Sequence, residues 1–238
     1  MARLLFGPLF AVLCTAPLPG QDIAAVWFPT HKGDSWIYQH ETRNDIGQGA
    51  AHPQVHRWKT EETLFSSVAL PEGTLIGKRI RVFDGTPPAQ YAPRAADAYL
   101  LHNDCIYTNN VDWFPLRHQL APEFSKLLSD GTVSPDFCFP LEVGKTWGAP
   151  HPAQPPATEA PSTGAKQWQV AAIEDHDRSA PGHRRTFHIT SISSASRSGT
   201  TVDIWFAQGF GVVRELRVQH GTYGEERITL LSFDPALR

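Results

Sequence analysis

The sequence predicts a mainly β protein built on an antiparallel sheet, and three observations support this. Five segments between residues 167 and 233 alternate apolar and polar residues at regular spacing, which is typical of an antiparallel meander. The 238 residues include 20 prolines and 18 glycines, which indicates many turns. A nine-residue pattern that would introduce a strand occurs twice, at residues 28–36 and 139–147.

Both copies of this pattern read Phe-Pro, three further residues, Gly, one residue, a hydroxyl residue and Trp. Proline keeps the preceding residue extended, and glycine tolerates the positive φ of a tight turn. We therefore expect an extended entry, a turn and a strand in each copy, with the Trp packed in the core. The copies divide a single β-rich domain, residues 21–238, into two partly repeated halves, 21–138 and 139–238.

Composition and charge set broad limits on the function. The chain is 41% hydrophobic and 19% charged, and it is long enough to bury a sizeable core. Its net charge is −3 and no basic block occurs, so nothing predicts a nucleic-acid surface. No stretch of the mature chain is apolar for long enough to span a membrane.

Residues 1–20 have the features of a signal peptide. Arg3 supplies a positive charge, residues 4–13 are apolar, and small residues and prolines follow. The apolar run is too short to cross a bilayer. We therefore expect an exported protein, periplasmic or secreted. Cys14 offers the alternative of a lipid anchor, but Leu13 stands before it where lipoprotein signals carry Gly, Ala or Ser.

In the first half the alternation predicts strands over residues 36–43, 55–68, 74–83, 98–102 and 105–107. The second of these also suits a helix, because Glu61 and Glu62 lie beside Lys59; the turn residues that follow it favour a strand. Asn103 and Asp104 tolerate left-handed backbone and predict a two-residue hairpin turn.

The segment between the halves predicts a short helix and a disulfide. Residues 120–128 have helical apolar spacing, with Pro122 suited to the first turn. Cys105 and Cys138 remain once the leader is removed, and in an oxidising compartment they would pair. The alternative for these cysteines is two buried free thiols.

The second half begins with a proline-rich loop at residues 148–165, expected to be exposed. The alternation then predicts strands over residues 167–173, 185–193, 200–207, 211–219 and 227–233. Residues 174–177, Glu-Asp-His-Asp, read as a solvated turn between two of them. Gly209 and Gly211 permit a bulge that would let the sheet curl.

The segment Trp-Phe-Ala-Gln-Gly-Phe-Gly-Val-Val at residues 205–213 resembles a signature found in a loose group of exported bacterial proteins, mostly of unknown function. In that group an early Phe-Pro…Gly…Trp segment and a later Pro-Leu…Val-Gly…Trp segment precede the signature, as residues 28–36 and 139–147 do here. The resemblance implies a strongly curved antiparallel sheet or half-barrel with one or two short helices, similar to periplasmic lipoprotein-carrier folds. It brings no catalytic residues. The Pro-Ala-Gly-x-Phe hairpin of the group has an approximate counterpart here, at residues 180–187.

Candidate catalytic and metal sites are weak. Gly33-Asp34-Ser35 is similar to the nucleophile segment of GDS-type esterases, but the late Asp-x-x-His that pairs with the serine is missing. Among the 11 histidines, His52 and His56 are separated by a proline, and His183 and His188 have no evident third ligand. We expect neither a catalytic site, a metal site nor a cofactor.

The candidate ligand-binding residues are aromatic: Trp36, Tyr38, Trp147, Trp168 and Trp205. The hypothesis that they favour is an exported cell-envelope protein that binds a lipid, another apolar ligand or an envelope protein. Two alternatives stay open. One is an exported hydrolase using Ser35 or a His/Asp cluster, and the other is an interaction module without a small ligand.

Overall fold

The computed structural model describes residues 23–44, 53–70, 73–93, 95–109, 134–148, 167–176, 184–192, 199–220 and 224–236. The elements of the first half are α1 (Ile23–Trp27), β1 (Ser35–Asn44), β2 (Gln54–Leu70), β3 (Gly73–Gly85), the 3₁₀ turn η1 (Ala89–Tyr91), β4 (Ala96–His102), β5 (Cys105–Asn109) and β6 (Phe137–Cys138). Those of the second half are β7 (Thr146–Gly148), β8 (Gln167–His176), β9 (Arg184–Ile192), β10 (Thr200–Ala207), β11 (Gly211–Gln219) and β12 (Gly224–Asp234).

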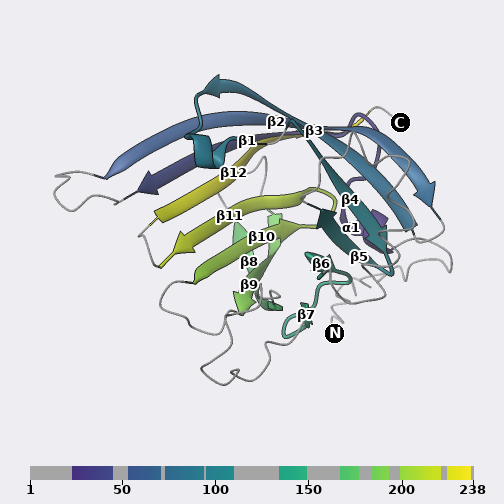
Figure 1. Cartoon of the computed structure of the whole chain (residues 1–238). Helices are drawn as coiled ribbons and strands as arrows, with labels where there is room; N and C mark the ends of the chain where they lie inside the picture. The colour runs from purple at the N-terminus through teal and green to yellow at the C-terminus, as the bar shows by residue number, and fades with distance from the viewer. Residues whose placement is uncertain are drawn as a thin grey trace, which may run out of the picture.

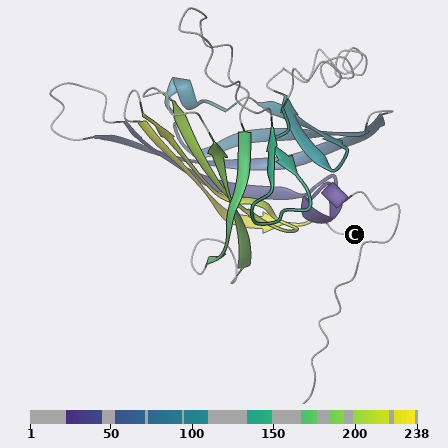
Figure 2. The same ribbon diagram turned by 90° about the horizontal axis from the view of Figure 1, so that it is seen from below.

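The strands of the described residues form one antiparallel sheet, in the order β6-β5-β4-β3-β2-β1-β12-β11-β10-β9-β8-β7 (Figure 1). The sheet curls strongly, as Figure 2 shows. Its two edge strands, β6 and β7, follow each other in the chain, and the indole Nε1 of Trp147 on β7 donates to the carbonyl oxygen of Asp136 at 3.1 Å. The edges therefore approach each other, and the predicted curved, half-barrel-like antiparallel sheet is confirmed as a nearly closed barrel.

The first copy of the nine-residue pattern forms a tight turn that docks on β2. Gly33 has φ of +100°, and the Asp34 N–H bonds to the His31 carbonyl at 3.0 Å. The Gly33 N–H donates to the Leu64 carbonyl at 2.8 Å, and the Leu64 N–H donates to the Asp34 carbonyl at 3.0 Å. Positive φ is the conformation that favours glycine, so the residue type follows from the turn.

The second copy repeats these contacts on β8. Gly144 has φ of +88°, and the Lys145 N–H bonds to the Glu142 carbonyl at 3.0 Å. The Gly144 N–H donates to the Val170 carbonyl at 2.8 Å, and the Val170 N–H donates to the Lys145 carbonyl at 3.0 Å. Each of these three backbone hydrogen bonds of the first copy thus has a counterpart in the second, and the comparison matches Leu64 with Val170.

The match extends beyond the turns into the next pair of strands. The pairing of β2 with β3 shifts register between Leu64 and Ser66, and the pairing of β8 with β9 shifts between Val170 and Ala172. A bulge at the same distance from the turn places the following residues of both halves in the same phase.

Aromatic residues from both halves fill the core around Phe206, which is fully buried. The ring of Phe206 lies 5.3 Å from that of Phe137 and 5.4 Å from that of Phe139. After α1, the Phe28 ring contacts the rings of Trp36 at 6.0 Å and Phe206 at 6.5 Å. The first pattern therefore ties the N-terminal segment to the middle of the barrel.

The predicted strands, the Asn103–Asp104 hairpin turn and the disulfide are confirmed. Asn103 and Asp104 have φ of +48° and +61°, and Cys105 and Cys138 are joined by a disulfide. The solvated turn expected at residues 174–177 is wrong for its first three residues, because β8 continues to His176 and pairs with β9 over this length.

Helix α1 was not expected, since five residues are too few to show helical periodicity. Several predictions concern residues that the structure does not describe. These are the signal peptide at 1–20 with Cys14, the helix at 120–128, the proline-rich loop beyond residue 148, and the histidines at 52 and 183.

Candidate functional site

The curled sheet encloses a cavity of about 290 Å³. This volume is close to the lower end of the range for small-molecule sites, roughly 300–1,000 Å³. Side chains from both halves line it: β2, β3, β4 and β11 contribute charged groups, whereas β8 and β10 contribute apolar ones. We define the polar wall as Glu62, Lys78, Asp97 and Tyr99, and the apolar wall as Trp168, Val202 and Ile204.

Strand alternation turns the charges of the polar wall inward. Glu62 lies two residues before the buried Leu64 on β2, and Lys78 lies two residues after the buried Ile76 on β3. Alternate residues of a strand face the same side of the sheet, so both charged side chains point to the interior. Asp97 lies opposite Lys78 in the pairing of β3 with β4.

Lys78 makes the central contacts of the polar wall. Its Nζ donates to Oε2 of Glu62 at 2.7 Å, and only 8% of the Lys78 side chain and 16% of the Glu62 side chain are exposed. The Lys78 ammonium also lies 4.8 Å from the centre of the Tyr99 ring, in cation–π contact. The cation is therefore held by a carboxylate and an aromatic face in a largely dry environment.

These surroundings fix the ionisation of the polar wall. Burial alone would lower the pKa of Lys78, but Glu62, Tyr99 and Asp97 together outweigh it, with Glu62 contributing most, and the pKa is raised well above its ordinary value. Burial raises the pKa of Tyr99 and of Tyr38, each with a further contribution from the Glu62 charge. At neutral pH the wall thus presents an ammonium group and neutral phenols.

Asp97 differs from Glu62 in its partners. Its Oδ1 accepts a hydrogen bond from the Ala98 N–H at 2.9 Å, and the side chain is half-buried on the cavity wall. Within the part of the chain that the structure describes, no cationic group forms an ion pair with Asp97. The Asp97 charge contributes to the raised pKa of Lys78 across the strand pair, but the carboxylate is not tied up in an ion pair and can receive a further positive group.

The opposite side of the cavity is apolar. Trp168, Val202 and Ile204 are buried and face it from β8 and β10. Phe137 of β6 and Ile106 of β5 continue this surface towards the edge of the sheet. A ligand in the cavity would meet aromatic and aliphatic groups here without a hydrogen-bonding partner.

A second charged group lies on β11 and β12. Arg217 donates to Glu215, and its Nη1 lies 3.5 Å from Oε2 of Glu226. Half of the Arg217 side chain is exposed, so the cavity is open to solvent beside it. The two carboxylates balance the guanidinium charge locally.

His40 of β1 lies between the polar wall and the charged group around Arg217. Its Nε2 is 2.9 Å from Oγ1 of Thr60, its ring stacks on Trp58 at 5.0 Å, and its Nδ1 is 3.9 Å from Oε1 of Glu226. The buried His40 Nδ1, Trp58 Nε1 and Thr42 Oγ1 have no hydrogen-bond partner among the described residues. Buried polar atoms of this kind are normally satisfied by water or a ligand.

The predicted ligand-binding aromatic residues fall into two groups. Trp36, Tyr38 and Trp168 line the cavity, whereas Trp147 and Trp205 do not. The polar atoms of Trp36 and Tyr38 serve the fold: the indole Nε1 donates to the Phe210 carbonyl at 2.7 Å, and the phenol donates to the Val212 carbonyl at 3.0 Å. Their contribution to the cavity is therefore ring surface.

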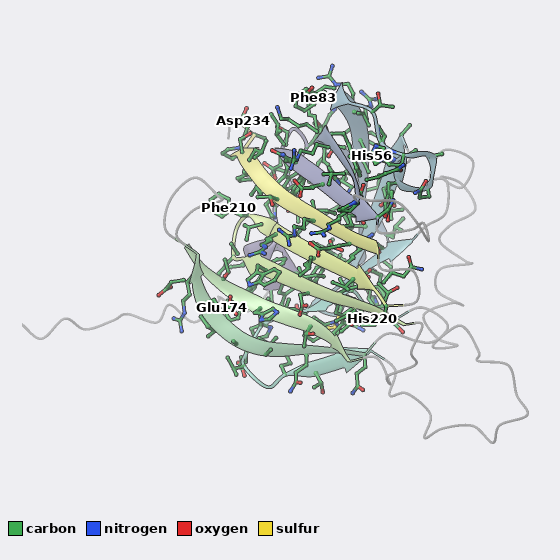
Figure 3. The ribbon with its side chains drawn as sticks, turned by 90° about the vertical axis from the view of Figure 1, so that its left-hand side faces the viewer. His56, Phe83, Glu174, Phe210, His220 and Asp234 are labelled. Atoms are coloured by element: carbon green, nitrogen blue, oxygen red, sulfur yellow. A yellow bond between two sulfur atoms is a disulfide. The ribbon has the colours of Figure 1, made fainter. Side chains whose placement is uncertain are left out.

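Trp205 is buried and belongs to a cluster with polar groups of the neighbouring strands, among them Glu174 of β8, which Figure 3 labels. Its ring stacks on His188 at 4.7 Å, its Nε1 donates to Glu174 at 2.8 Å, and the Arg214 guanidinium lies 4.5 Å from its centre. His188 Nε2 is 2.9 Å from Oδ1 of Asp203. This network links β8 to β11.

The candidate nucleophile Ser35 is at the start of β1, opposite Thr63 of β2 and Asp234 of β12. No hydrogen bond joins its hydroxyl to a histidine in the described ranges. Across these same residues, no three His, Cys, Asp or Glu side chains are placed to hold a metal ion. Nor is any described helix long and apolar enough to cross a membrane.

Sequence reasoning singled out aromatic residues and missed the polar wall. A signal was present: Glu62 and Lys78 share the alternation phase of Leu64 and Ile76, which reads as the buried side of each strand. A charged residue in that phase indicates an interior polar site, because lysine and glutamate are rarely buried without a partner.

Comparisons with known proteins identify no family. No protein-family model matches the chain, and no curated protein matches it. A solved structure described as an exported protein with a YmcC-like fold, from Bacteroides fragilis, has 8% identity and a TM-score of 0.44 over 88% of this chain and 99% of its own.

Two further solved structures are similar. One, described as a lipoprotein of Parabacteroides distasonis, has 12% identity and a TM-score of 0.39 over 87% of this chain and 97% of its own. The other, described as an outer membrane lipoprotein-sorting protein domain of Vibrio parahaemolyticus, has 10% identity and a TM-score of 0.24 over 87% of both chains. At these TM-scores the similarities assign neither a family nor a function to the chain.

Proposed function

We propose that this protein is an exported binding protein of the cell envelope, without a catalytic role, that holds a small amphiphilic molecule inside its barrel. The observation that carries the proposal is the cavity of about 290 Å³ with a charged wall on β2–β4 facing an apolar wall on β8 and β10. A ligand with one polar and one apolar end matches both walls, whereas a purely apolar ligand would displace water from the charged groups without replacing the hydrogen bonds of that water.

Export is part of the proposal and is supported by the leader-like composition of residues 1–20 and by the disulfide between Cys105 and Cys138. Structural disulfides persist in oxidising compartments outside the cytosol. The choice between periplasm and secretion follows from fractionation of the producing cell. N-terminal sequencing of the mature protein would test whether Cys14 is removed with the leader.

Native mass spectrometry of the mature protein purified from an envelope fraction tests the binding function, with parallel extraction into organic solvent. We expect a reproducible adduct of a few hundred daltons, of the order that a cavity of this size accepts. Extraction should release the same molecule. A clean mass of the protein alone, with an empty extract, would overturn the proposal.

A pair of variants ties the adduct to the cavity. Val202→Phe enlarges a side chain on the apolar wall and should remove most of the adduct, because the added ring occupies the space of the ligand. Val55→Phe makes the same change at an exposed position of β2 that does not line the cavity, and should leave the adduct unchanged. Equal adducts in both variants would place the bound molecule elsewhere.

A further inference from the structure

The two halves of the barrel share a backbone plan, so their walls can be compared position by position. The turn contacts match Leu64 with Val170, and the bulge that follows keeps the two halves in phase. Leu64 pairs with Lys78, and Val170 pairs with Ile189, so Lys78 and Ile189 occupy the same place in their halves.

The same pairing identifies the counterparts of the other polar-wall residues. Lys78 pairs with Asp97 of β4, and Ile189 pairs with Ile204 of β10. Glu62 precedes Leu64 by two residues and pairs with Trp36, just as Trp168 precedes Val170 by two and pairs with Trp147. Tyr99 and Phe206 correspond in the same way, through Ile76 and Phe187. The correspondences are therefore Glu62 with Trp168, Lys78 with Ile189, Asp97 with Ile204 and Tyr99 with Phe206.

The second half builds these positions from apolar residues alone. The fold therefore does not need the charges of the polar wall: the same strands, turn and bulge form with Trp, Ile, Ile and Phe in their place. Placing an ion pair in the interior removes both ions from water, and apolar residues of similar volume often stabilise a protein equally well or better. The function of the charges has to be sought in what the cavity holds.

The charge of the lining indicates the class of ligand. Four carboxylates line the cavity, Glu62, Asp97, Asp136 and Glu215, against two cationic side chains, Lys78 and Arg217. Two negative charges thus remain. Lys78 forms an ion pair with Glu62, and Arg217 with Glu215. Asp97 lies opposite Lys78 and adds to the electrostatic stabilisation of its ammonium, but among the described residues it forms no ion pair.

Aromatic rings surround the same space. Those of Phe28, Trp36, Tyr38, Tyr99 and Trp168 all line the cavity. The face of an aromatic ring attracts a positive charge, and a set of such faces combined with a carboxylate is the usual environment of bound organic ammonium groups.

Building on the proposed function, we propose that the polar end of the ligand is an organic ammonium group, held near Asp97 by that carboxylate and the surrounding rings, with the apolar end against Trp168, Val202 and Ile204. An anionic head group would meet an excess of carboxylates, and the cations that could receive it are already engaged. A neutral head group would not offset the net negative charge of the lining.

Three probes of equal chain length separate these cases: hexyltrimethylammonium, hexanol and hexanoate. Isothermal titration calorimetry with the mature, oxidised protein should give a dissociation constant for hexyltrimethylammonium about tenfold or more below those of the other two, since a close counter-charge and cation–π contact act on the cation alone. Binding should weaken as salt is added.

A matched pair of variants locates the charge. Asp97→Asn removes one negative charge at nearly constant shape and should weaken hexyltrimethylammonium binding about tenfold while leaving hexanol binding unchanged. Asp234→Asn makes the same change at the exposed end of β12 (Figure 3), at a residue that does not line the cavity, and should change neither. Unchanged hexanol binding also shows that the Asp97 variant is folded.

The remaining outcomes count against the inference in distinguishable ways. Equal affinities for the three probes, or tighter binding of hexanoate, would overturn the ammonium inference and leave the binding of amphiphiles intact. Failure of all three probes to bind, together with a clean native mass, would overturn both proposals. Loss of ammonium binding in both aspartate variants would show that overall charge, rather than Asp97, attracts the cation.

Discussion

The buried pair of Glu62 and Lys78 provides the sharpest test of the reasoning, because single and double substitutions should act in opposite directions. Glu62→Leu removes the carboxylate 2.7 Å from an ammonium group that is 8% exposed. It leaves a buried charge without its main partner, a change that typically costs about 3–5 kcal/mol. Asp97 remains across the strand pair from Lys78, which places our expectation at the lower end, about 3 kcal/mol.

The double variant Glu62→Leu/Lys78→Met should recover this loss. Coulomb's law with an effective dielectric constant of about 20 gives the pair an attraction of about 6 kcal/mol at this distance, and the desolvation of the two ions costs several kcal/mol each. The two terms nearly cancel. We therefore expect the double variant to be as stable as the original protein or more stable, by up to about 4 kcal/mol.

Urea denaturation followed by tryptophan fluorescence measures these changes in the free energy of unfolding. In a thermal scan the single variant should unfold roughly 6–12 °C lower, given 2–4 °C per kcal/mol for a chain of this size. Glu61→Gln is the matched control: Glu61 is the neighbour of Glu62 on the same strand and forms an ion pair with Arg81 on the exposed face, at 2.5 Å. Its loss should cost less than about 1 kcal/mol.

The result that would refute the reasoning is a double variant as unstable as the single one. The charged pair would then be needed by the fold, in contrast to the apolar counterpart positions of the second half. The charges of the polar wall would then have a structural role and would no longer indicate a ligand, whatever the probes bind.

Three further predictions concern the fold. Reduction of the Cys105–Cys138 disulfide, or Cys→Ser at both positions, should lower the free energy of unfolding by about 3–4 kcal/mol, from the sequence separation of 33 residues, in urea titrations with and without reductant. The pKa of Lys78 is raised in the folded state, so the contribution of Lys78 to the free energy of unfolding is complete below about pH 10.4. Above that pH the contribution is lost at about 1.4 kcal/mol per pH unit. Lys78→Met should therefore flatten the decline of the free energy of unfolding with rising pH, measured by urea titrations from pH 9 to 11. Gly144→Ala should lower the free energy of unfolding by about 1–2 kcal/mol through its positive φ alone, since no atom lies within 4 Å of the added carbon. Gly33→Ala should lower it further, because its added carbon would lie 3.2 Å from a side-chain carbon. Equal losses of stability in thermal unfolding would contradict this prediction.

The sequence predicted the strands well because their physical signal is local. Alternation over β8 to β12 depends on neighbouring residues alone, and Asn103-Asp104 carries its turn preference in two residues. The repeated pattern was equally predictable, because its proline and its glycine (Gly33 and Gly144) determine the local backbone conformation. Pairing of Cys105 with Cys138 needed only the count of cysteines outside residues 1–20.

The candidate site was not predictable in the same way, because it depends on which strands become neighbours. Glu62, Lys78 and Asp97 come from three strands, and their contact follows from a register set by turns and by the bulge after Leu64. A shift of one residue would turn Lys78 to the outer face. Their inward phase could be read from the chain, but not the partners that they would meet.

The difference between the two halves predicts the orientation of a ligand in the cavity. A barrel made from two matched halves has two matched walls, and equal walls would hold a symmetric molecule or none in particular. Here the first half carries Lys78 and Asp97 on the polar wall, whereas the matching positions of the second half are Ile189, which is buried in the core, and Ile204, which belongs to the apolar wall. A ligand whose ammonium group lies at Asp97 would direct its alkyl chain towards the apolar wall. Burying the chain against Ile204 and Trp168 contributes about 25 cal/mol per Å² of apolar surface. In the reverse orientation the alkyl chain would desolvate the charged groups of the polar wall. The difference between the halves thus fixes which end of the ligand enters each side, and lengthening the alkyl chain of the probe should strengthen binding until the apolar wall is covered.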